Sequence, residues 1–361
     1  MSRPVTFGVI NTFGNPDEWR QPWKQRYDAI FEQIEWIDQE TAIDGVYVTE
    51  HHFYDDGYIP ATMVMCGAIA ARTRRVRIGT NLIQLPLHNP VRLAEDALVV
   101  DALSGGRFRL GVGMGYYHQE FNGLGQRLAE RVSRTEEGIA ILRKAFSGEP
   151  FEFHGKRYDF GEISVTPGPV RDGGPEIWMG GFAPAAVRRA ARLADGFLEF
   201  DPGTHRTYFE ECDRLGKDKA GQQLNVTYWA IIDEDPERAF AQAGHHWMHL
   251  LNQYILRDAY AARTPALTEP YDDPKKALAD GLVMLADGPA AVKVFNADVD
   301  KGAIDINLVT MMPGEPVDQV TERLAYLNDK VIPHVKLTGH PAAGSPSASP
   351  GAPRAEHPNR T

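Results

Sequence analysis

Two adjacent histidines and a glutamate follow a short apolar run near the N-terminus, at Glu50, His51 and His52. Imidazole exchanges protons near neutral pH, so such a residue could act as a base or donate a hydrogen bond to an anion. Because side chains alternate along an extended chain, we expect only one of the two histidines to face a common site. Loop histidines bonded to backbone carbonyls are an equally good interpretation of their position. Adjacent histidines rarely chelate one ion and no third ligand is identifiable, so we predict no metal site.

A glycine-rich segment follows another apolar run and could lie against a ligand. Its glycines alternate with other residues, at Gly111, Gly113 and Gly115, and would let a flat or bulky group approach the backbone. The spacing does not match G-x-G-x-x-G, so we do not predict a Rossmann site. Small residues packed inside a barrel explain the pattern equally well.

A glycine pair lies between a predicted strand and a helix that we expect to begin near Pro184. Gly180 and Gly181 are followed there by Phe182. Backbone N–H groups at a helix start bind phosphate, helped by the helix dipole. A plain strand-to-helix turn is the alternative, and we favour phosphate.

A histidine-rich segment later in the chain is a weaker candidate. His245 and His249 are one helical turn apart, but the glutamate of the H-E-x-x-H zinc motif is missing. We expect these residues to pack within an insertion. Nucleotide-hydrolase, serine-hydrolase and EF-hand spacings are also missing from the sequence.

The composition limits the partners of the protein. The chain has 361 residues, with 38 Lys and Arg against 49 Asp and Glu, a net charge of −11. Nucleic acids and anionic membranes need clustered basic residues, so we predict neither as a partner. Two cysteines are too few for a disulfide framework, and no segment reads as a membrane span or signal peptide. We therefore expect a cytoplasmic protein.

Short β-branched runs alternate with amphipathic segments from Val5 to Lys336, which is typical of βα units around a parallel sheet. Eight such units predict one closed (β/α)8 TIM barrel, an α/β fold, over residues 1–337. Residues 235–288 exceed what one helix needs, so we place an insertion there, before the last βα unit. Residues 338–361, rich in Pro, Ala, Ser and Gly, are expected to form a disordered tail. The predicted strands are 5–10, 45–49, 76–80, 107–112, 176–179, 196–200, 224–232 and 304–311, and the predicted helices are 24–41, 61–72, 90–103, 127–146, 185–193, 208–215, 289–299 and 316–335.

In a barrel of this kind, chemistry takes place where the strands end at their carboxyl edge. Polar, ionisable and glycine residues gather at four of these predicted edges, in segments 49–53, 81–82, 113–118 and 180–182. The fold therefore brings the candidate segments described above to one end of the barrel.

In their order and spacing these segments resemble the luciferase-like flavin-dependent monooxygenase superfamily. The resemblance extends from Val5 to about Lys336 and is least clear in the insertion. The segments that carry it are 50–53 (EHHF), 79–86 (GTNLIQLP), 89–96 (NPVRLAED), 106–113 (GRFRLGVG), 120–121 (EF), 178–181 (WMGG) and 194–196 (ADG).

The resemblance implies a barrel, usually dimeric, that binds reduced FMN supplied by a separate flavin reductase and uses O2 to oxygenate a substrate. His51 matches the catalytic histidine of the family. Asn81 and Leu82 match a strand end that commonly has a non-prolyl cis peptide beneath the flavin ring, and Gly113 matches a position against that ring. The phosphate-binding turn is matched by Gly180, Gly181 and Phe182.

One departure concerns the phosphate of the flavin. Bacterial luciferase has an arginine where this chain has Met114. Backbone groups or another base, such as Arg188, would therefore have to bind the phosphate. Relatives in the same superfamily use the deazaflavin F420 and transfer hydride without activating oxygen. The segment 50–53 favours the luciferase-like monooxygenases over the F420-dependent relatives.

We therefore predict an FMN-dependent two-component monooxygenase for a small, largely apolar substrate. The alternatives are an F420-dependent hydride-transfer oxidoreductase and a non-catalytic flavin-binding protein of the same fold. The residues expected to line the substrate end are Tyr116, Tyr117, His118, Trp247 and Tyr254.

Overall fold

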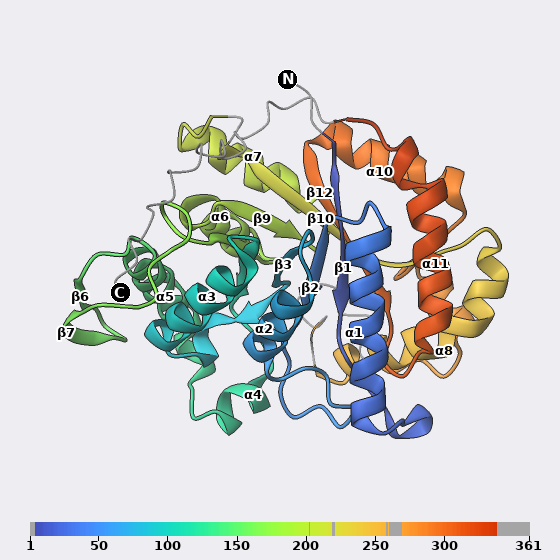
Figure 1. Cartoon of the computed structure of the whole chain (residues 1–361), viewed down its shortest axis with the longest axis horizontal. Helices are drawn as coiled ribbons and strands as arrows, with labels where there is room; N and C mark the ends of the chain where they lie inside the picture. Colours follow the sequence, from blue (N-terminus) through green and yellow to red (C-terminus); the bar gives the residue numbers. More distant parts are fainter. Residues whose placement is uncertain (1–3, 202, 219–220, 258, 260–268, 338–361) are drawn as a thin grey trace, which may run out of the picture.

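The computed structural model describes residues 4–201, 203–218, 221–257, 259 and 269–337. Eight parallel strands form a closed barrel in it, because β9 pairs with β10 and β12 pairs with both β10 and β1. The predicted (β/α)8 fold is therefore confirmed (Figure 1). The barrel strands are β1 (Thr6–Asn11), β2 (Gly45–Val48), β3 (Arg77–Thr80), β5 (Phe108–Gly113), β8 (Glu176–Gly180), β9 (Gly196–Glu199), β10 (Gln223–Ile232) and β12 (Ala303–Met311).

Helices surround the barrel and bury its outer face. Every residue of β2, β5, β9 and β12 is buried, which explains why these strands read as nearly continuous apolar runs rather than alternating ones. The helices that return the chain between barrel strands or follow the last one are α1 (Trp23–Glu40), α2 (Thr62–Arg72), α3 (Pro90–Ser104), α5 (Arg131–Ala145), α6 (Pro184–Leu193), α7 (Thr204–Arg214), α10 (Gly288–Lys301) and α11 (Val317–Lys330).

Local sequence signals fix several helix starts. Asn89 caps α3 by accepting hydrogen bonds from the backbone N–H groups of Val91 and Arg92, and Pro90 occupies the first turn. Asp235 caps α8 (Pro236–Ile255) and Asp287 caps α10 in the same way. These caps place the loops that precede the helices at the carboxyl ends of the strands.

Other elements lie outside the eight βα units. A short strand, β4 (Ile83–Gln84), pairs with β5, and α4 (His118–Gly123) follows β5. The hairpin β6 (Phe151–His154) and β7 (Asp159–Ile163) projects from one side of the barrel (Figure 1). Between β10 and α10, where the sequence predicts an insertion, the chain forms α8, α9 (Pro274–Ala279) and β11 (Met284–Ala286). The predicted tail, residues 338–361, lies outside the described residues.

The interior of the barrel contains a connected set of polar side chains. Arg109 donates a hydrogen bond of 2.6 Å to Asp305, and both side chains are almost fully buried. Asn225 bonds to Asp305 at 3.2 Å and accepts a bond from Thr227 at 2.9 Å. The side-chain amide of Asn81, directly after β3, donates a hydrogen bond of 3.5 Å to the hydroxyl of Thr227. Buried charges are tolerated only when they are paired in this manner.

Cys66 and Cys212 are both buried and form no disulfide. Among the described residues, no helix is both long and apolar enough to cross a lipid bilayer. Nor does that part of the chain bring three or more His, Cys, Asp or Glu side chains together in a way that could hold a metal ion.

Candidate active site

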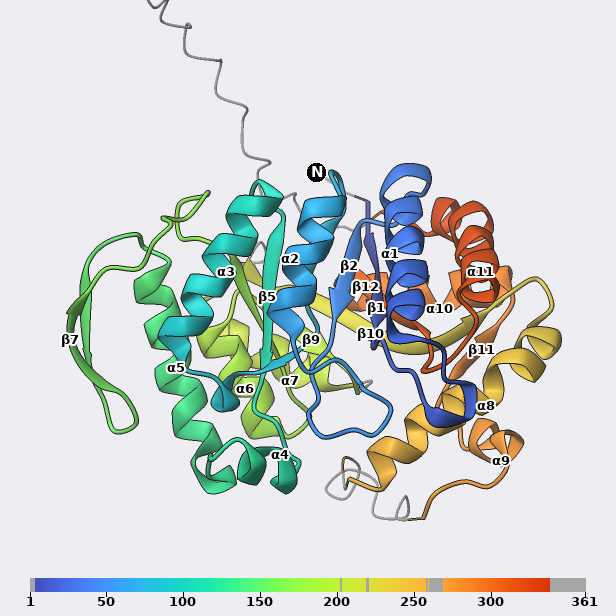
Figure 2. The same cartoon turned by 60° about the horizontal axis from the view of Figure 1, so that its bottom comes forward.

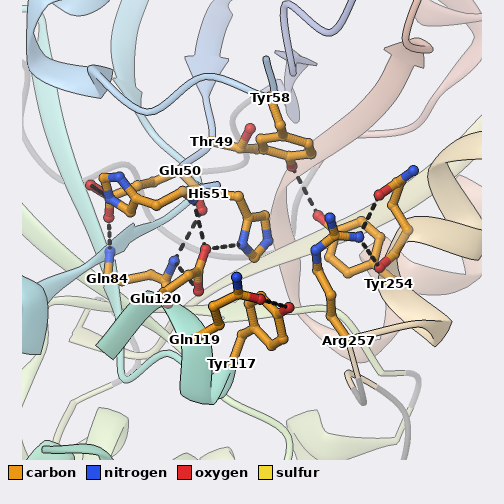
Figure 3. A network of polar contacts seen from close by, with 12 residues as sticks. Thr49, Glu50, His51, Tyr58, Gln84, Tyr117, Gln119, Glu120, Tyr254 and Arg257 are labelled. Atoms are coloured by element: carbon orange, nitrogen blue, oxygen red, sulfur yellow. Dashed lines mark hydrogen bonds and ion pairs between the residues drawn. The ribbon is translucent and has the colours of Figure 1, made fainter. Parts of the chain in front are cut away.

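The carboxyl ends of the strands carry the segments singled out from the sequence. Helices α4 and α8 lie at this same end of the barrel (Figure 2). Figure 3 shows the polar contacts at this mouth, with His51 between Glu120 on one side and Tyr58 and Tyr254 on the other.

His51 follows β2 and is held by a buried carboxylate. Its Nδ1 lies 2.8 Å from Oε1 of Glu120, whose side chain has no exposed area. The same oxygen accepts a hydrogen bond from the backbone N–H of His52 at 2.8 Å, and Oε2 accepts one from the amide of Gln84 at 3.0 Å. Because a carboxylate only accepts, the proton of a neutral His51 lies on Nδ1 and the lone pair on Nε2. The arrangement can therefore present a proton acceptor in a fixed orientation.

A second buried carboxylate, Glu50, holds the backbone around His51. It accepts hydrogen bonds from the backbone N–H of Gln84 and from Nε2 of His88, the latter at 2.6 Å. Burial would raise the pKa of Glu50, but the charge of His88 and hydrogen bonds from His52, His88 and Gln84 lower it to about 2. Burial opposes the charged form of His88, and Glu50 nevertheless raises the pKa of that imidazole. This ion pair joins the loops that follow β2 and β3.

Four tyrosines surround His51. The ring of Tyr54 stacks on the imidazole, with centroids 4.7 Å apart, and Tyr58, Tyr116 and Tyr254 contact it edge-on at 4.8 to 5.9 Å. The hydroxyls of Tyr58 and Tyr254 are 2.9 Å apart. Burial raises the pKa of all four phenols, that of Tyr58 to about 12. These groups are therefore neutral at physiological pH and can donate hydrogen bonds.

Leu82 follows β3 and packs over two glycines at the ends of β5 and β8. The Asn81–Leu82 peptide bond is cis, as the sequence resemblance implies. A Cβ atom added at Gly113 would lie 2.5 Å from Cδ1 of Leu82, and one at Gly180 would lie 2.6 Å from its Cδ2. Any larger residue at either position would displace the leucine. Asn81 is 3% exposed and its Oδ1 has no hydrogen-bond partner among the described residues.

The turn after β8 leads directly into α6. A Cβ atom at Gly181 would lie 2.7 Å from that of Ala186, so glycine allows the turn to approach the helix closely. No side chain caps the first turn of α6, which begins at Pro184 as expected. Phe182 is 43% exposed, and its ring lies 6.0 Å from that of Phe200.

An arginine lies beside Met114, but it is not the one suggested by the sequence. Arg188 is exposed, whereas the guanidinium of Arg189 contacts the sulfur of Met114 at 3.5 Å. Arg189 also binds Glu136 at 2.7 Å, and its side chain is 11% exposed. The geometry thus places a cation next to the position where bacterial luciferase has arginine.

The sequence pattern of luciferase-like monooxygenases matches residues 5–288. The chain belongs to this family. It is 33% identical to the alkanal monooxygenase alpha chain of Photobacterium leiognathi, over 82% of this chain and 90% of that protein. It is 30% identical to an F420-dependent glucose-6-phosphate dehydrogenase of Nakamurella multipartita, over 56% of this chain and 63% of the relative. It spans about half the length, 54%, of an uncharacterized Mycobacterium tuberculosis protein with which it is 38% identical.

Solved structures share the fold of this luciferase-like protein. The monooxygenase RslO1 from Streptomyces bottropensis superposes with a TM-score of 0.77 at 22% identity, over 91% of this chain and 99% of that one. The oxygenating constituent of 3,6-diketocamphane monooxygenase from Pseudomonas putida, in complex with FMN, gives 0.72 at 18% identity, over 93% and 100%. A solved structure of the same fold is thus described with FMN, and a sequence relative with F420.

The predicted substrate residues of this luciferase-like protein do not all lie in the same environment. Tyr116 and Tyr254 contact the ring of His51. Tyr117 immediately precedes α4 and donates a hydrogen bond to Gln119, and His118 is exposed at the first position of that helix. Trp247 has no exposed area and packs in the apolar face of α8. A substrate role for these five residues stays a prediction.

Sequence reasoning missed several residues that hold the histidine. Glu120 was noted only as part of a family segment, and Gln84, Tyr54 and Tyr58 were not singled out. Gln84 and Glu120 lie in segments that follow two other strands, so the strand-edge rule could have nominated them. The sequence suggested Arg188 instead of Arg189, because neighbouring residues of a helix point in different directions and the sequence does not show which of them faces Met114.

Proposed function

We propose that the protein is the oxygenating component of an FMN-dependent two-component monooxygenase that acts on a small, largely apolar organic substrate. The observation that carries this proposal is the buried His51–Glu120 pair, at the same carboxyl end of the barrel as Leu82, Gly113 and Gly180. Membership of the luciferase-like family supports it.

The residues at the mouth fit a flat tricyclic ring. Leu82 provides an apolar contact between two positions that lack side chains, and Asn81 offers a buried oxygen without a partner among the described residues. Bound there, reduced FMN would supply the electrons that activate O2. The chain would hold its ring on Leu82 and Gly113 and its phosphate near Gly181.

His51 would orient the reacting groups and accept a proton. Glu120 fixes Nδ1 as the protonated nitrogen, so Nε2 is the nitrogen available to take a proton from the substrate. The surrounding tyrosine rings exclude water, which strengthens hydrogen bonds and charge interactions at the imidazole.

Arg189 would bind the flavin phosphate. It would take the role of the luciferase arginine whose position is occupied here by Met114. Glu136 is 41% exposed and also lies 3.7 Å from Arg192, so it can keep one cationic partner when Arg189 turns to phosphate. Replacing Arg189 with Met should weaken FMN binding by about tenfold or more, because a charge-assisted contact is lost. Riboflavin, which has no phosphate, should bind the variant and the parent equally. Calorimetry with both flavins checks this, and an equal loss for riboflavin would contradict the assignment.

A flavin reductase and a second copy of this chain are the proposed protein partners. A separate reductase follows from the two-component scheme. Exposed apolar side chains on neighbouring helices support a homodimer, including Val64 on α2 and Val99 and Leu103 on α3, which are 44–70% exposed. Native mass spectrometry would report both the subunit number and the retained cofactor.

Anaerobic titration with reduced FMN and reduced F420 tests the cofactor. Tight FMN binding, followed by transfer of one oxygen atom from isotopically labelled O2 to an aldehyde, ketone or phenol, is the expected result. Tight F420 binding with no oxygen transfer would instead establish the hydride-transfer alternative, which the dehydrogenase relative favours. His51→Ala separates an enzyme from a flavin-binding protein, because only the enzyme has turnover to lose.

A further inference from the structure

Arg257, directly after α8, brings a buried guanidinium to the aromatic cluster around His51. The residue is 9% exposed. Its guanidinium carbon lies 3.7 Å from the ring centroid of Tyr54 and 5.6 Å from that of Tyr117. Figure 3 shows its side chain beside Tyr117 and Tyr254, at the same mouth as His51. Tyr54 therefore stacks on His51 and also contacts this cation.

Only one nitrogen of this guanidinium has a hydrogen bond among the described residues. Nη1 donates to the backbone oxygen of Gln253 at 3.1 Å and to its side-chain oxygen. Nε is buried without an acceptor in that part of the chain. The edge formed by Nε and Nη2 is the one that binds both oxygens of a carboxylate in parallel.

No described carboxylate forms an ion pair with Arg257. Three buried carboxylates near the mouth already have donors. Glu120 binds His51, the amide of Gln84 and a backbone N–H, Glu50 binds His88, and Asp56 binds His249 and the backbone N–H of Tyr58. Taking a cation out of water is unfavourable unless an anion compensates for it. The ring of Tyr54 compensates only in part, because a cation–π contact is weaker than a buried ion pair.

The geometry points to an acidic substrate: a largely apolar, aromatic molecule whose carboxylate, or an equivalent pair of acid oxygens, binds the Nε–Nη2 edge of Arg257. This inference rests on the proposed function and names its substrate class. The rings of Tyr54, Tyr116 and Tyr254 provide aromatic surfaces for the rest of the molecule. Arg257 is then a specificity-determining residue.

Matched pairs of aromatic acids and their primary amides test the inference. Benzoate and benzamide, 4-hydroxybenzoate and its amide, and 2-naphthoate and its amide have nearly the same shape and differ in charge. We expect the tightest-binding acid to bind the full-length protein about tenfold or more tightly than its amide. Arg257→Met should abolish this preference, and Arg257→Lys should retain part of it because the charge stays while the two-donor edge is lost.

Arg238→Met is the matched control, because Arg238 lies on α8 and its side chain is half-exposed and paired with Asp233. It should keep the full preference for acids. Equal binding of every acid and its amide would overturn the inference, and so would a preference that persists in Arg257→Met. Calorimetry with FMN is run on the same samples and tests the proposed function separately, since Arg257 is not assigned to the flavin. Unchanged melting temperatures confirm that the variants are folded, and Arg257→Lys decides the result if the Met variant is not.

Discussion

Replacement of Glu120 tests the idea that a buried carboxylate orients the catalytic imidazole. Glu120 has no exposed side-chain area and accepts three hydrogen bonds, of 2.8, 2.8 and 3.0 Å, from His51, His52 and Gln84. A hydrogen bond to a charged group contributes about 1.5 to 3 kcal/mol. Loss of the one to His51 should therefore lower kcat/KM about 10- to 150-fold.

The variants Glu120→Gln and Glu120→Ala separate charge from shape. The glutamine keeps the volume and can still accept some of the bonds, so we expect a smaller loss than for alanine. Turnover is measured as oxygen transfer with reduced FMN. Nitrogen NMR of the histidines gives a readout that general destabilisation would not change: the proton of His51 should be on Nδ1 in the parent and divide between both nitrogens in Glu120→Ala.

Glu95→Gln is the control, because Glu95 is 40% exposed, pairs with Arg92 on the same helix and should leave activity unchanged. Full kcat/KM in Glu120→Ala, together with an unchanged His51 tautomer, would refute the positioning role. A loss of activity without a change of tautomer would assign Glu120 to the stability of the loop instead.

Three further predictions concern the surroundings of the site. Gly113→Val should displace the side chain of Leu82, weaken FMN binding about tenfold or more and lower the free energy of unfolding by about 1 to 3 kcal/mol. Flavin titration measures the first effect and urea unfolding the second. Unchanged FMN affinity would contradict the proposed ring contact. The lowered pKa of Glu50 stabilises the fold above pH 4.5 and loses this effect as pH falls toward 2, whereas the raised pKa of His88 stabilises it below pH 6.5 and loses this effect as pH rises. His88→Gln should therefore flatten the pH dependence of the unfolding free energy at both ends, and parallel curves for parent and variant would argue against the pair. Asp305→Asn should destabilise the barrel by about 3 to 5 kcal/mol because Arg109 loses its charged partner, and a shift under 1 kcal/mol in chemical unfolding would contradict this.

The barrel could be predicted because each unit repeats a strong local signal. The buried strands appear as short β-branched or apolar runs, and the helix faces repeat every three to four residues, as Ile30, Ile34 and Ile37 do on α1. The hairpin of β6 and β7 was not predicted. Phe151 and Phe153 do alternate with exposed polar residues, but over only four positions, and the strand pairs with β7 alone.

The site was predictable only where it depends on strand ends. Gly113 ends β5, Asn81 directly follows β3 and His51 lies three residues after β2, so the barrel rule places them together. Glu120 lies on α4, a few residues beyond the end of β5, and Arg257 lies just after α8. Their distance from His51 depends on how those segments pack, which periodicity does not report. The same holds for Arg189, where a one-residue change in position along α6 turns the side chain by about 100°.

The hydrogen bonds described above for His51, Glu50 and Glu120 all lie in the first third of the chain, although the ring of Tyr254 also contacts the imidazole. Glu50, Gln84, His88 and Glu120 precede residue 124, whereas Arg189 and Arg257 come from later units. Gene recombination after α4 could therefore exchange the two arginines that we propose to contact ligands, while the hydrogen bonds around His51 are kept. A barrel divided in this way can acquire a new ligand specificity when recombination replaces its later βα units.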